Sequence, residues 1–451
     1  MSNIQANLIL SLSELLADSG SSHWMYSGTA IRMAQIMRLN KEYHQGQSLR
    51  DRELRRRTFW ACVCFDRMLA FLLSKPCTLA AANIGIALPS TDISLLYEEN
   101  THGLTLDNIA AFSRRPSEIG LAPYFIKTVM LWSELANLRV FRSRLIDVLP
   151  PTNPNSRISR YHEALRSWVG ILPPVLRWTR QNHRLHQGLG QARTFIAMHF
   201  LIHGAFCVAN QMYLPQSDGA SILHETVDAA GWSILRGEPA FISAAAVNAL
   251  AMGEMASYLT DVDVDAHSDL QSVWVLNAML AAANTLFWLE YADDIEPIDD
   301  PLVRSRAKSY INLLTSLFTA WSEHWTAAKS CLATFNGLAT TYAEAYLRQD
   351  NNAGGNFGEQ SETDSVNCTS SPDPEIESQY RPKPGDGLPP LTEESLLSSR
   401  AALGLNVVDV STNAVMHKHR FWLRFTSACP PILDGIDDYI LGELDSQGIF
   451  P

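Results

Sequence analysis

Apolar side chains recur every three or four residues over most of this chain, the spacing that places them on one face of an α-helix. Glycine and proline fall between these periodic stretches, where they end helices. Strict alternation of apolar and polar residues is nearly absent, and the best strand candidate, 407–410, is short. The pattern therefore predicts an all-α fold. We expect helices at roughly 3–17, 22–38, 49–73, 105–112, 118–148, 156–172, 190–214, 240–260, 270–291, 302–328 and 330–348.

The stretch 48–73 illustrates why a helix is expected. Ser48 is a favourable N-cap residue, and Asp51 and Glu53 place negative charge at the positive end of the helix dipole. Five arginines in the first turns allow two interpretations. They form a phosphate-binding or nuclear-import patch, or an ion-paired helix face, and the interleaved acids favour the second. These arginines are Arg50, Arg52, Arg55, Arg56 and Arg57.

The composition changes after Arg348. From 349 to 394 the chain is rich in Asn, Gly, Ser, Pro and acids, with ten acidic residues against two basic ones. Such a segment buries too little apolar surface to offset the entropy of ordering it. We therefore expect a large multi-helix domain over 1–348, a disordered acidic linker over 349–395, and a short C-terminal helical tail over 396–451.

The last twenty residues combine acidic and bulky apolar side chains. Residues 432–451 hold five acids and no base, with Tyr439, Ile440 and Leu441 among the apolar residues. Two interpretations stay open. The composition is typical of acidic activation segments, in which these three side chains would contact a partner. It also fits a terminal amphipathic helix that packs on the main domain, which is the more common case.

Charge and cysteine content exclude several classes of protein. With 35 basic and 47 acidic residues the formal net charge is −12, which excludes a strongly basic protein that coats nucleic acid. The seven cysteines include no Cys-x-x-Cys pair, which favours the cytosol or nucleus. The N-terminus lacks the basic start of a signal peptide. The apolar run 273–289 is short and interrupted by polar residues, so we expect a buried helix and no membrane contact.

No constellation of residues supports a catalytic mechanism, so we expect no enzyme activity and no catalytic, cofactor-binding or metal-binding residue. His199 and His203 are four residues apart, but no carboxylate on the same turn completes a zinc site. The acidic stretch 261–269 resembles the start of a calcium loop, with Ala266 in place of the required glycine. Two core or interface histidines and a solvated acidic loop are the expected explanations.

One long stretch is far more specific than these motifs. The sequence SSHWMYSGTAIRMAQIMRLNKE, followed by RELRRRTFWACVCFDRMLAFLLSKPCTL and IGIALPSTD, resembles the middle homology region of the fungal zinc-cluster transcription factors. The resemblance is strong over about 5–92 and weaker to about 215. Asn40 stands where the family often has His, and Ser74 and Lys75 replace Gly-Arg. The signature residues are Trp24, Gly28, Arg32, Glu53, Arg56, Arg57, Phe59, Trp60, Asp66, Arg67, Pro76, Leu88 and Pro89.

The resemblance implies structural roles for most of this signature. Arg56, Arg57 and Asp66 are expected in ion pairs together with Arg67, while the aromatic pair that follows Thr58 is expected in the core. The resemblance also implies that 1–348 is a fungal-specific transcription factor regulatory domain, whose packed helices can hold a small-molecule effector or a partner protein. The fold is then expected to serve a nuclear regulator of RNA polymerase II transcription.

The family's DNA-reading module has no counterpart in this sequence. Members usually carry an N-terminal zinc cluster built from six cysteines, whereas no cysteine precedes Cys62 here. Zinc is therefore expected only if such a cluster lies upstream, and no cofactor is expected in the chain itself. A truncated gene model, a fragment and a regulator that lacks its own DNA-binding head all fit this pattern.

Three hypotheses follow. In the first, the chain is the effector region of a zinc-cluster regulator, which meets DNA indirectly or through the missing N-terminal module. Its partners are then the transcription machinery or a co-regulator, and a homodimer is compatible with it. In the second, it is a head-less interaction protein that dimerises with or titrates full-length relatives. The third and least supported is an enzyme or lipid carrier with an internal helical pocket.

Overall fold

The computed structural model describes the protein over most of its first 354 residues. Within the described ranges every regular element is a helix, which confirms the all-α prediction, and an isolated bridge between Lys41 and Gly85 is the sole strand-like pairing there. The described residues are 1–18, 20–42, 46–73, 75–91, 103–109, 119–140, 153–211, 214, 239–262, 269–291 and 301–354.

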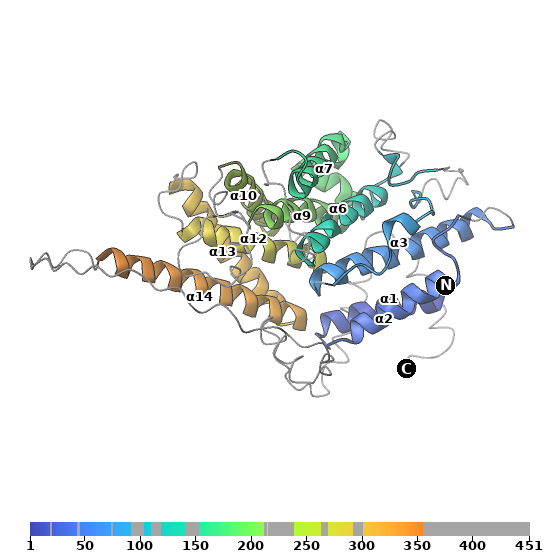
Figure 1. Cartoon of the computed structure of the whole chain (residues 1–451), viewed down its shortest axis with the longest axis horizontal. Helices are drawn as coiled ribbons and strands as arrows, with labels where there is room; N and C mark the ends of the chain where they lie inside the picture. Colours follow the sequence, from blue (N-terminus) through green and yellow to red (C-terminus); the bar gives the residue numbers. More distant parts are fainter. Residues whose placement is uncertain are drawn as a thin grey trace, which may run out of the picture.

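The helices form a stack that follows the order of the chain (Figure 1). α1 and α2 form a hairpin that packs against α3, and α3 packs against α6. α9 lies at the centre and contacts α6, α7, α8, α10 and α12, while α12 also contacts α13 and α14. The helices are α1 Ser2–Leu16, α2 Ser22–Ile36, α3 Leu49–Leu72, α6 Ala122–Val140, α7 Arg157–Ile171, α8 Arg180–Gly188, α9 Ala192–Asn210, α10 Pro239–Val262, α12 Val273–Tyr291, α13 Pro301–Ser322 and α14 Thr326–Gly354, with short 3₁₀ turns η1 Ala81–Asn83 and η3 Pro174–Leu176.

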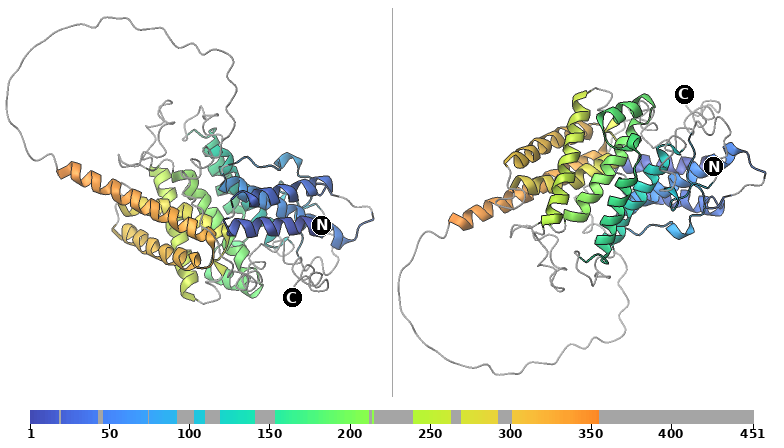
Figure 2. Two further views of the ribbon diagram at one scale, coloured as in Figure 1. Left: turned by 90° about the horizontal axis from the view of Figure 1, so that it is seen from below. Right: turned by 90° about the horizontal axis from the view of Figure 1, so that it is seen from above.

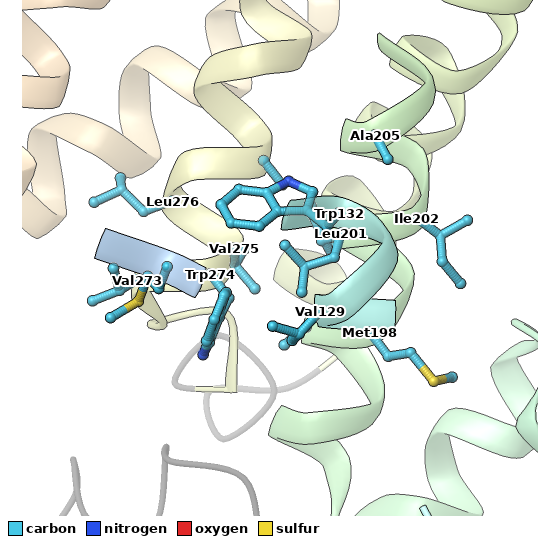
Figure 3. Packing of buried hydrophobic residues seen from close by; sticks show 14 of the residues in the cluster. Val129, Trp132, Met198, Leu201, Ile202, Ala205, Val273, Trp274, Val275 and Leu276 are labelled. Carbon is cyan, nitrogen blue, oxygen red and sulfur yellow. The ribbon is translucent and has the colours of Figure 1, made fainter. Parts of the chain in front are cut away.

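Buried apolar side chains of α6, α9 and α12 pack together in the core (Figure 3). Trp132 of α6 and Trp274 of α12 pack edge to face with ring centroids 5.9 Å apart, and Phe71 of α3 lies against Trp132. A side chain at Gly204 of α9 would place its Cβ 3.1 Å from the Cβ of Ala278 on α12. Glycine therefore lets the two helices approach closely, which joins the N-terminal and C-terminal halves of the stack.

The long helix α14 ties the two ends of the stack together and then extends beyond it, as both views in Figure 2 show. Near its start, the hydroxyl of Ser330 donates to a carboxylate oxygen of Asp18 at 2.7 Å, next to the end of α1. Further along, the hydroxyl of Tyr342 donates to Asn284 of α12 at 3.1 Å, whose amide in turn donates to Gln211 at the end of α9. These polar contacts fix the register of α14 against the body.

Three sequence predictions differ from the structure. Helix α8 was not predicted, because the only fully buried side chains on it are histidines instead of apolar residues. The composition predicts a linker from 349, but α14 continues to Gly354. Residues 105–109, predicted as the start of a helix, form turns that the side chain of Asn108 holds to Gly103 and Thr105.

Three helices, α9, α10 and α12, have the length and hydropathy of membrane spans. The sequence predicts that the apolar run in α12 is buried, and 72% of the most apolar window of this helix is buried inside the molecule. The corresponding window of α9 is 78% buried and that of α10 is 56% buried. In this structure the apolar residues of these three helices therefore serve to pack the helices together inside the body.

Candidate functional site

The signature residues converge on α3 and on the segment 75–91, here called the strap, which runs back along α3 in the opposite direction. Asp66, near the end of α3, contacts the start of the strap, and Glu53, near the beginning of α3, contacts its end. Trp60, between them, contacts Ala87. The helix thus holds an irregular segment at three levels along its length.

The first level is an ion pair that is itself bonded to the strap backbone. The two carboxylate oxygens of Asp66 accept the backbone N–H groups of Thr78 and Leu79, both at 2.9 Å. Arg67 donates to the same carboxylate at 3.1 Å and to the carbonyl of Leu79. Asp66 is 1% exposed and Arg67 is 3% exposed. Two charges can be buried here because each is paired and hydrogen-bonded.

The second level is apolar with one polar contact. The indole N–H of Trp60 donates to the carbonyl of Ala87 at 2.8 Å, and its ring packs edge to face on Phe59. Leu88 and Pro89 are buried beside this contact. Phe59 and Trp60 therefore lie in the core, and the Ile-x-Leu-Pro part of the signature is the portion of the strap that they cover.

The third level is a cluster of four charges. Arg57 donates to Glu53 at 2.9 Å, and the same Glu53 oxygen accepts the backbone N–H of Ser90 at 2.9 Å. Arg56 donates through two nitrogens to Glu42, which precedes α3 in the chain. Glu42 also accepts the backbone N–H of Ala87. The charged signature side chains of α3 thus form ion pairs and hydrogen bonds inside the molecule that hold the strap against the helix.

Burial settles the role of two of the five arginines in the basic run. Arg56 and Arg57 are 6% and 8% exposed and pair with Glu42 and Glu53. Asp51 lies in the first turn of α3, where Ser48 caps the helix by accepting its N–H at 3.1 Å. These two arginines are therefore ion-paired inside the molecule and are not available to a phosphate, whereas Arg50 of the same run is exposed.

The signature residues on α2 lie apart from this network. Trp24 is half-buried, with the ammonium of Lys75 4.8 Å from its ring centroid. Gly28 has open space where a Cβ would stand, so no close packing in this structure requires glycine there. Arg32 is exposed one turn further on, and Pro76 is exposed where the strap begins. The structure brings Trp24 near the strap and leaves Gly28 and Arg32 outside the network.

The cysteines of α3 are core residues. Cys62 and Cys64 are buried as free thiols, and burial raises the pKa of each to about 12. Cys77 at the start of the strap is half-buried, and its pKa is also raised, chiefly by burial. A thiol that stays protonated is a poor nucleophile and a poor metal ligand, so these cysteines act as small apolar side chains.

A second cluster gathers histidines and aromatic rings between α8, α9 and α10. Trp178 stacks on Phe195 with centroids 5.7 Å apart and meets His199 edge to face at 5.5 Å. The ring of His199 bonds the carbonyl of Leu176 at 2.9 Å, and His203 bonds Asn248 of α10 at 2.8 Å. Burial lowers the pKa of His199 to about 3 and also lowers that of His203.

These contacts give His199 and His203 partners within the protein, as expected of core histidines. Over the part of the chain that the structure describes, no group of three His, Cys, Asp or Glu side chains has the arrangement of a metal site. Most of the acidic stretch 261–269 lies outside the described residues, as do Tyr439, Ile440 and Leu441. The calcium-loop resemblance and the activation segment therefore stay sequence-level predictions.

Comparison with known families gives residues 1–227 as a fungal specific transcription factor domain. The chain belongs to this family. The match begins with the α1–α2 hairpin and includes α3, the strap, and the helices as far as α9. The network that holds the strap thus lies within the family domain. The resemblance to this family is confirmed. The matched region passes the end of the weaker resemblance at about 215, and it covers the first part of the domain predicted over 1–348.

The relatives include regulators from two fungi. An uncharacterized transcriptional regulatory protein of Schizosaccharomyces pombe is 28% identical over 231 residues, which is 45% of this chain and 23% of the relative. A second from that yeast is 25% identical over 230 residues, covering 45% of this chain and 33% of the relative. The Zn(2)-C6 fungal-type transcription factor FTF1c of Fusarium oxysporum is 25% identical over 214 residues, covering 43% and 23%. No solved structure matches the chain.

These relatives are much longer than the region they share with this chain. The chain matches about a quarter to a third of their length, and the family model covers residues 1–227 of this chain. The family domain in this protein is therefore joined to further helices, α10 to α14, which pack on it through α9 and α12.

Proposed function

We propose that this chain forms the regulatory region of a fungal transcription regulator of the zinc-cluster class and acts in the nucleus on RNA polymerase II transcription. The observation that supports this most directly is the family match over 1–227, together with relatives named as transcriptional regulators and Zn(2)-C6 transcription factors. We propose that contact with DNA comes from a zinc-cluster module outside this sequence, in a longer form of the chain or in a partner.

The geometry supports a regulatory body in preference to a catalyst. The charged residues of α3 are buried in pairs that hold the strap, and the buried cysteines keep their protons. Neither cluster presents a nucleophile beside a base, the arrangement that most hydrolytic mechanisms require. We propose that the body transmits the binding of a partner or a small molecule, and that output passes to the transcription machinery or a co-regulator.

For the output we propose the C-terminal segment 432–451, with Tyr439, Ile440 and Leu441 as contact residues. Its five acids keep bulky apolar side chains soluble, and such side chains bind shallow apolar surfaces of partners.

A reporter assay tests this proposal. The full chain, fused to an unrelated DNA-binding domain, is expected to change transcription of a reporter that carries the matching DNA site. The Y439A/I440A/L441A variant is expected to lose most of an activating effect, whereas a matched triple, V407A/V408A/V410A, is expected to keep it. Absence of any effect on the reporter in a fungal host would contradict the proposed function, and equal loss in both triples would contradict the role of 432–451.

A further inference from the structure

A surface on the outside of the body combines positive charge with exposed apolar side chains. Val175, Leu185 and Leu189 are 41%, 47% and 60% exposed, which is high for apolar residues in this body. Three exposed arginines lie in the same stretch of the chain. We call this set the α8 surface, and it consists of Val175, Arg177, Arg180, Arg184, Leu185 and Leu189.

Hydrogen bonds hold the α8 surface as one unit. The amide of Asn182 donates to the carbonyls of Pro174 and Arg177 at 2.7 and 2.8 Å, which fixes η3 against the start of α8. The ring of His186, on the buried side of α8, bonds the carbonyl of Val175 at 3.1 Å. The exposed side chains are therefore carried on a backbone that is already ordered, which reduces the entropy cost of binding to them.

No ion pair with a carboxylate is formed by Arg180 or Arg184 within the described residues. Arg177 donates to the carbonyl of Leu172, and the guanidinium of Arg180 lies 5.0 Å from the ring centroid of Tyr258. From 157 to 189 the chain has six arginines and a single acid, Glu163. The surface thus suits a ligand that is both acidic and apolar.

The chain itself contains a segment of that chemistry. Residues 432–451 have five acids, no base and nine bulky apolar side chains. At helical spacing, Leu433, Ile436, Ile440 and Leu444 share one side, while most of the acids fall on the other. We propose that this segment binds the α8 surface of the same chain, with its apolar side on the exposed leucines and its acids beside the arginines. The proposal does not depend on the proposed function.

The connection between the two is long enough. Between Gly354, where α14 ends, and Ile432 lie 77 residues. Residues 355–395, which the composition predicts to be a coil, span about 35 Å root-mean-square, and 36 more residues follow before Ile432. A body of this size has a radius of gyration of about 20 Å. Attachment of this kind gives a local concentration near the millimolar range, so weak complementarity is enough for the segment to occupy the surface.

Photo-crosslinking in the full chain tests the proposal directly. Benzoylphenylalanine in place of Leu189 is expected to crosslink to peptides from 432–451, as identified by mass spectrometry. The same group in place of Met25, which is 66% exposed on α2, serves as the control and is expected to give at least fivefold less of that product. Equal yields from both positions, or crosslinks from Leu189 to other parts of the chain alone, would overturn the proposal.

Charge-reversal variants test whether the acidic residues of 432–451 contact Arg180 and Arg184. The R180E/R184E variant is expected to lower the yield from position 189 at least fivefold, whereas K41E/K329E, which makes the same charge change at exposed sites elsewhere, is expected to leave it unchanged. Adding D434K/D437K/D438K to R180E/R184E is expected to restore the yield. Restoration also shows that the reversed body still folds, and failure to restore the yield in a variant with native helix content would contradict the proposed contact.

A mixture of isotopically light and heavy chains distinguishes the same chain from a second copy. Binding within one chain gives crosslinked peptide pairs of a single isotopic origin at every protein concentration. Mixed pairs that rise with concentration would assign the α8 surface to contact between two copies and overturn the proposal.

Discussion

The Asp66→Asn substitution tests whether the signature of α3 serves to hold the strap. Asparagine keeps the shape of the side chain but offers one acceptor oxygen in place of two. In the structure, Asp66 accepts the N–H groups of both Thr78 and Leu79 and also pairs with Arg67. After the substitution at least one of the two N–H groups faces an amide donor, and the charge of Arg67 stays buried with no counter-charge beside it.

The expected cost is large. Removing one member of a buried ion pair typically costs about 3–5 kcal/mol, because the remaining charge is left uncompensated. The carbonyl of Leu79 still accepts from Arg67 and limits the loss to that range. With an unfolding entropy of about 2.1 cal/mol/K per residue over the roughly 280 residues that the structure describes, this loss lowers Tm by about 5–9 °C.

Thermal and urea unfolding followed by circular dichroism measure the total, and hydrogen exchange with mass spectrometry locates it. Peptides that cover 77–90 are expected to exchange faster in D66N, while α9 and α12 stay protected. D51N makes the same chemical change at an exposed position in the first turn of α3 and is expected to cost less than about 1 kcal/mol. A D66N variant no less stable than D51N, with unchanged exchange over 77–90, would refute the idea that this pair anchors the strap.

Three further outcomes are expected. Gly253→Ala places a Cβ 2.2 Å from the ring of Tyr310 and should cost about 1–3 kcal/mol, whereas Gly337→Ala, with open space on α14, should stabilise by up to about 1 kcal/mol; urea midpoints compare the two. Burial holds the pKa of His199 near 3 in the folded protein, so below pH 6.5 the unfolded chain binds a proton that the folded protein does not. The stability that the neutral, buried His199 contributes is therefore complete above pH 6.5 and is lost as the pH falls toward 3. At pH 5 the loss is about 2 kcal/mol, and H199Q should flatten the pH dependence of the unfolding free energy between pH 7 and 5, whereas H324Q, at an exposed position, should not. Gly28→Ala should leave Tm unchanged or raise it, so a loss of reporter output in that variant would place a binding partner on α2.

The sequence predicts most of the helices because their buried sides are apolar. α9 and α12 have buried residues around most of their circumference, and their predicted bounds differ from the observed ones by a few residues. α8 was missed for the opposite reason. Its buried side chains, His183 and His186, read as polar in any hydropathy pattern, although Gly188 at its end is a common stop signal. A search for histidine at a spacing of three before glycine would have found it.

The signature could be identified from the sequence, but its geometry could not. Ion pairs were predicted for Arg56, Arg57 and Arg67, yet nothing in the local pattern shows that Glu42 lies opposite Arg56 or that Ser90 lies opposite Glu53. These contacts join positions 14 and 37 residues apart, and they depend on the path of an irregular segment. Periodic spacing of apolar residues predicts regular helices and strands. The strap is irregular, so no such spacing predicts its path.

The positions of the charged residues indicate that α3 stabilises the body and that other surfaces bind partners. Arg56, Arg57 and Arg67 are buried in fixed pairs, so substitutions there change the stability of the body and every activity that depends on it. Selectivity for one partner over another requires groups that are exposed and unpaired until the partner binds. In the described residues, Arg180 and Arg184 are exposed on an ordered helix and form no ion pair with a carboxylate, although Arg180 lies over the ring of Tyr258. Variants of α3 should therefore lose stability and output together, whereas charge reversal on α8 should alter binding while Tm stays within about 2 °C of the unmodified protein.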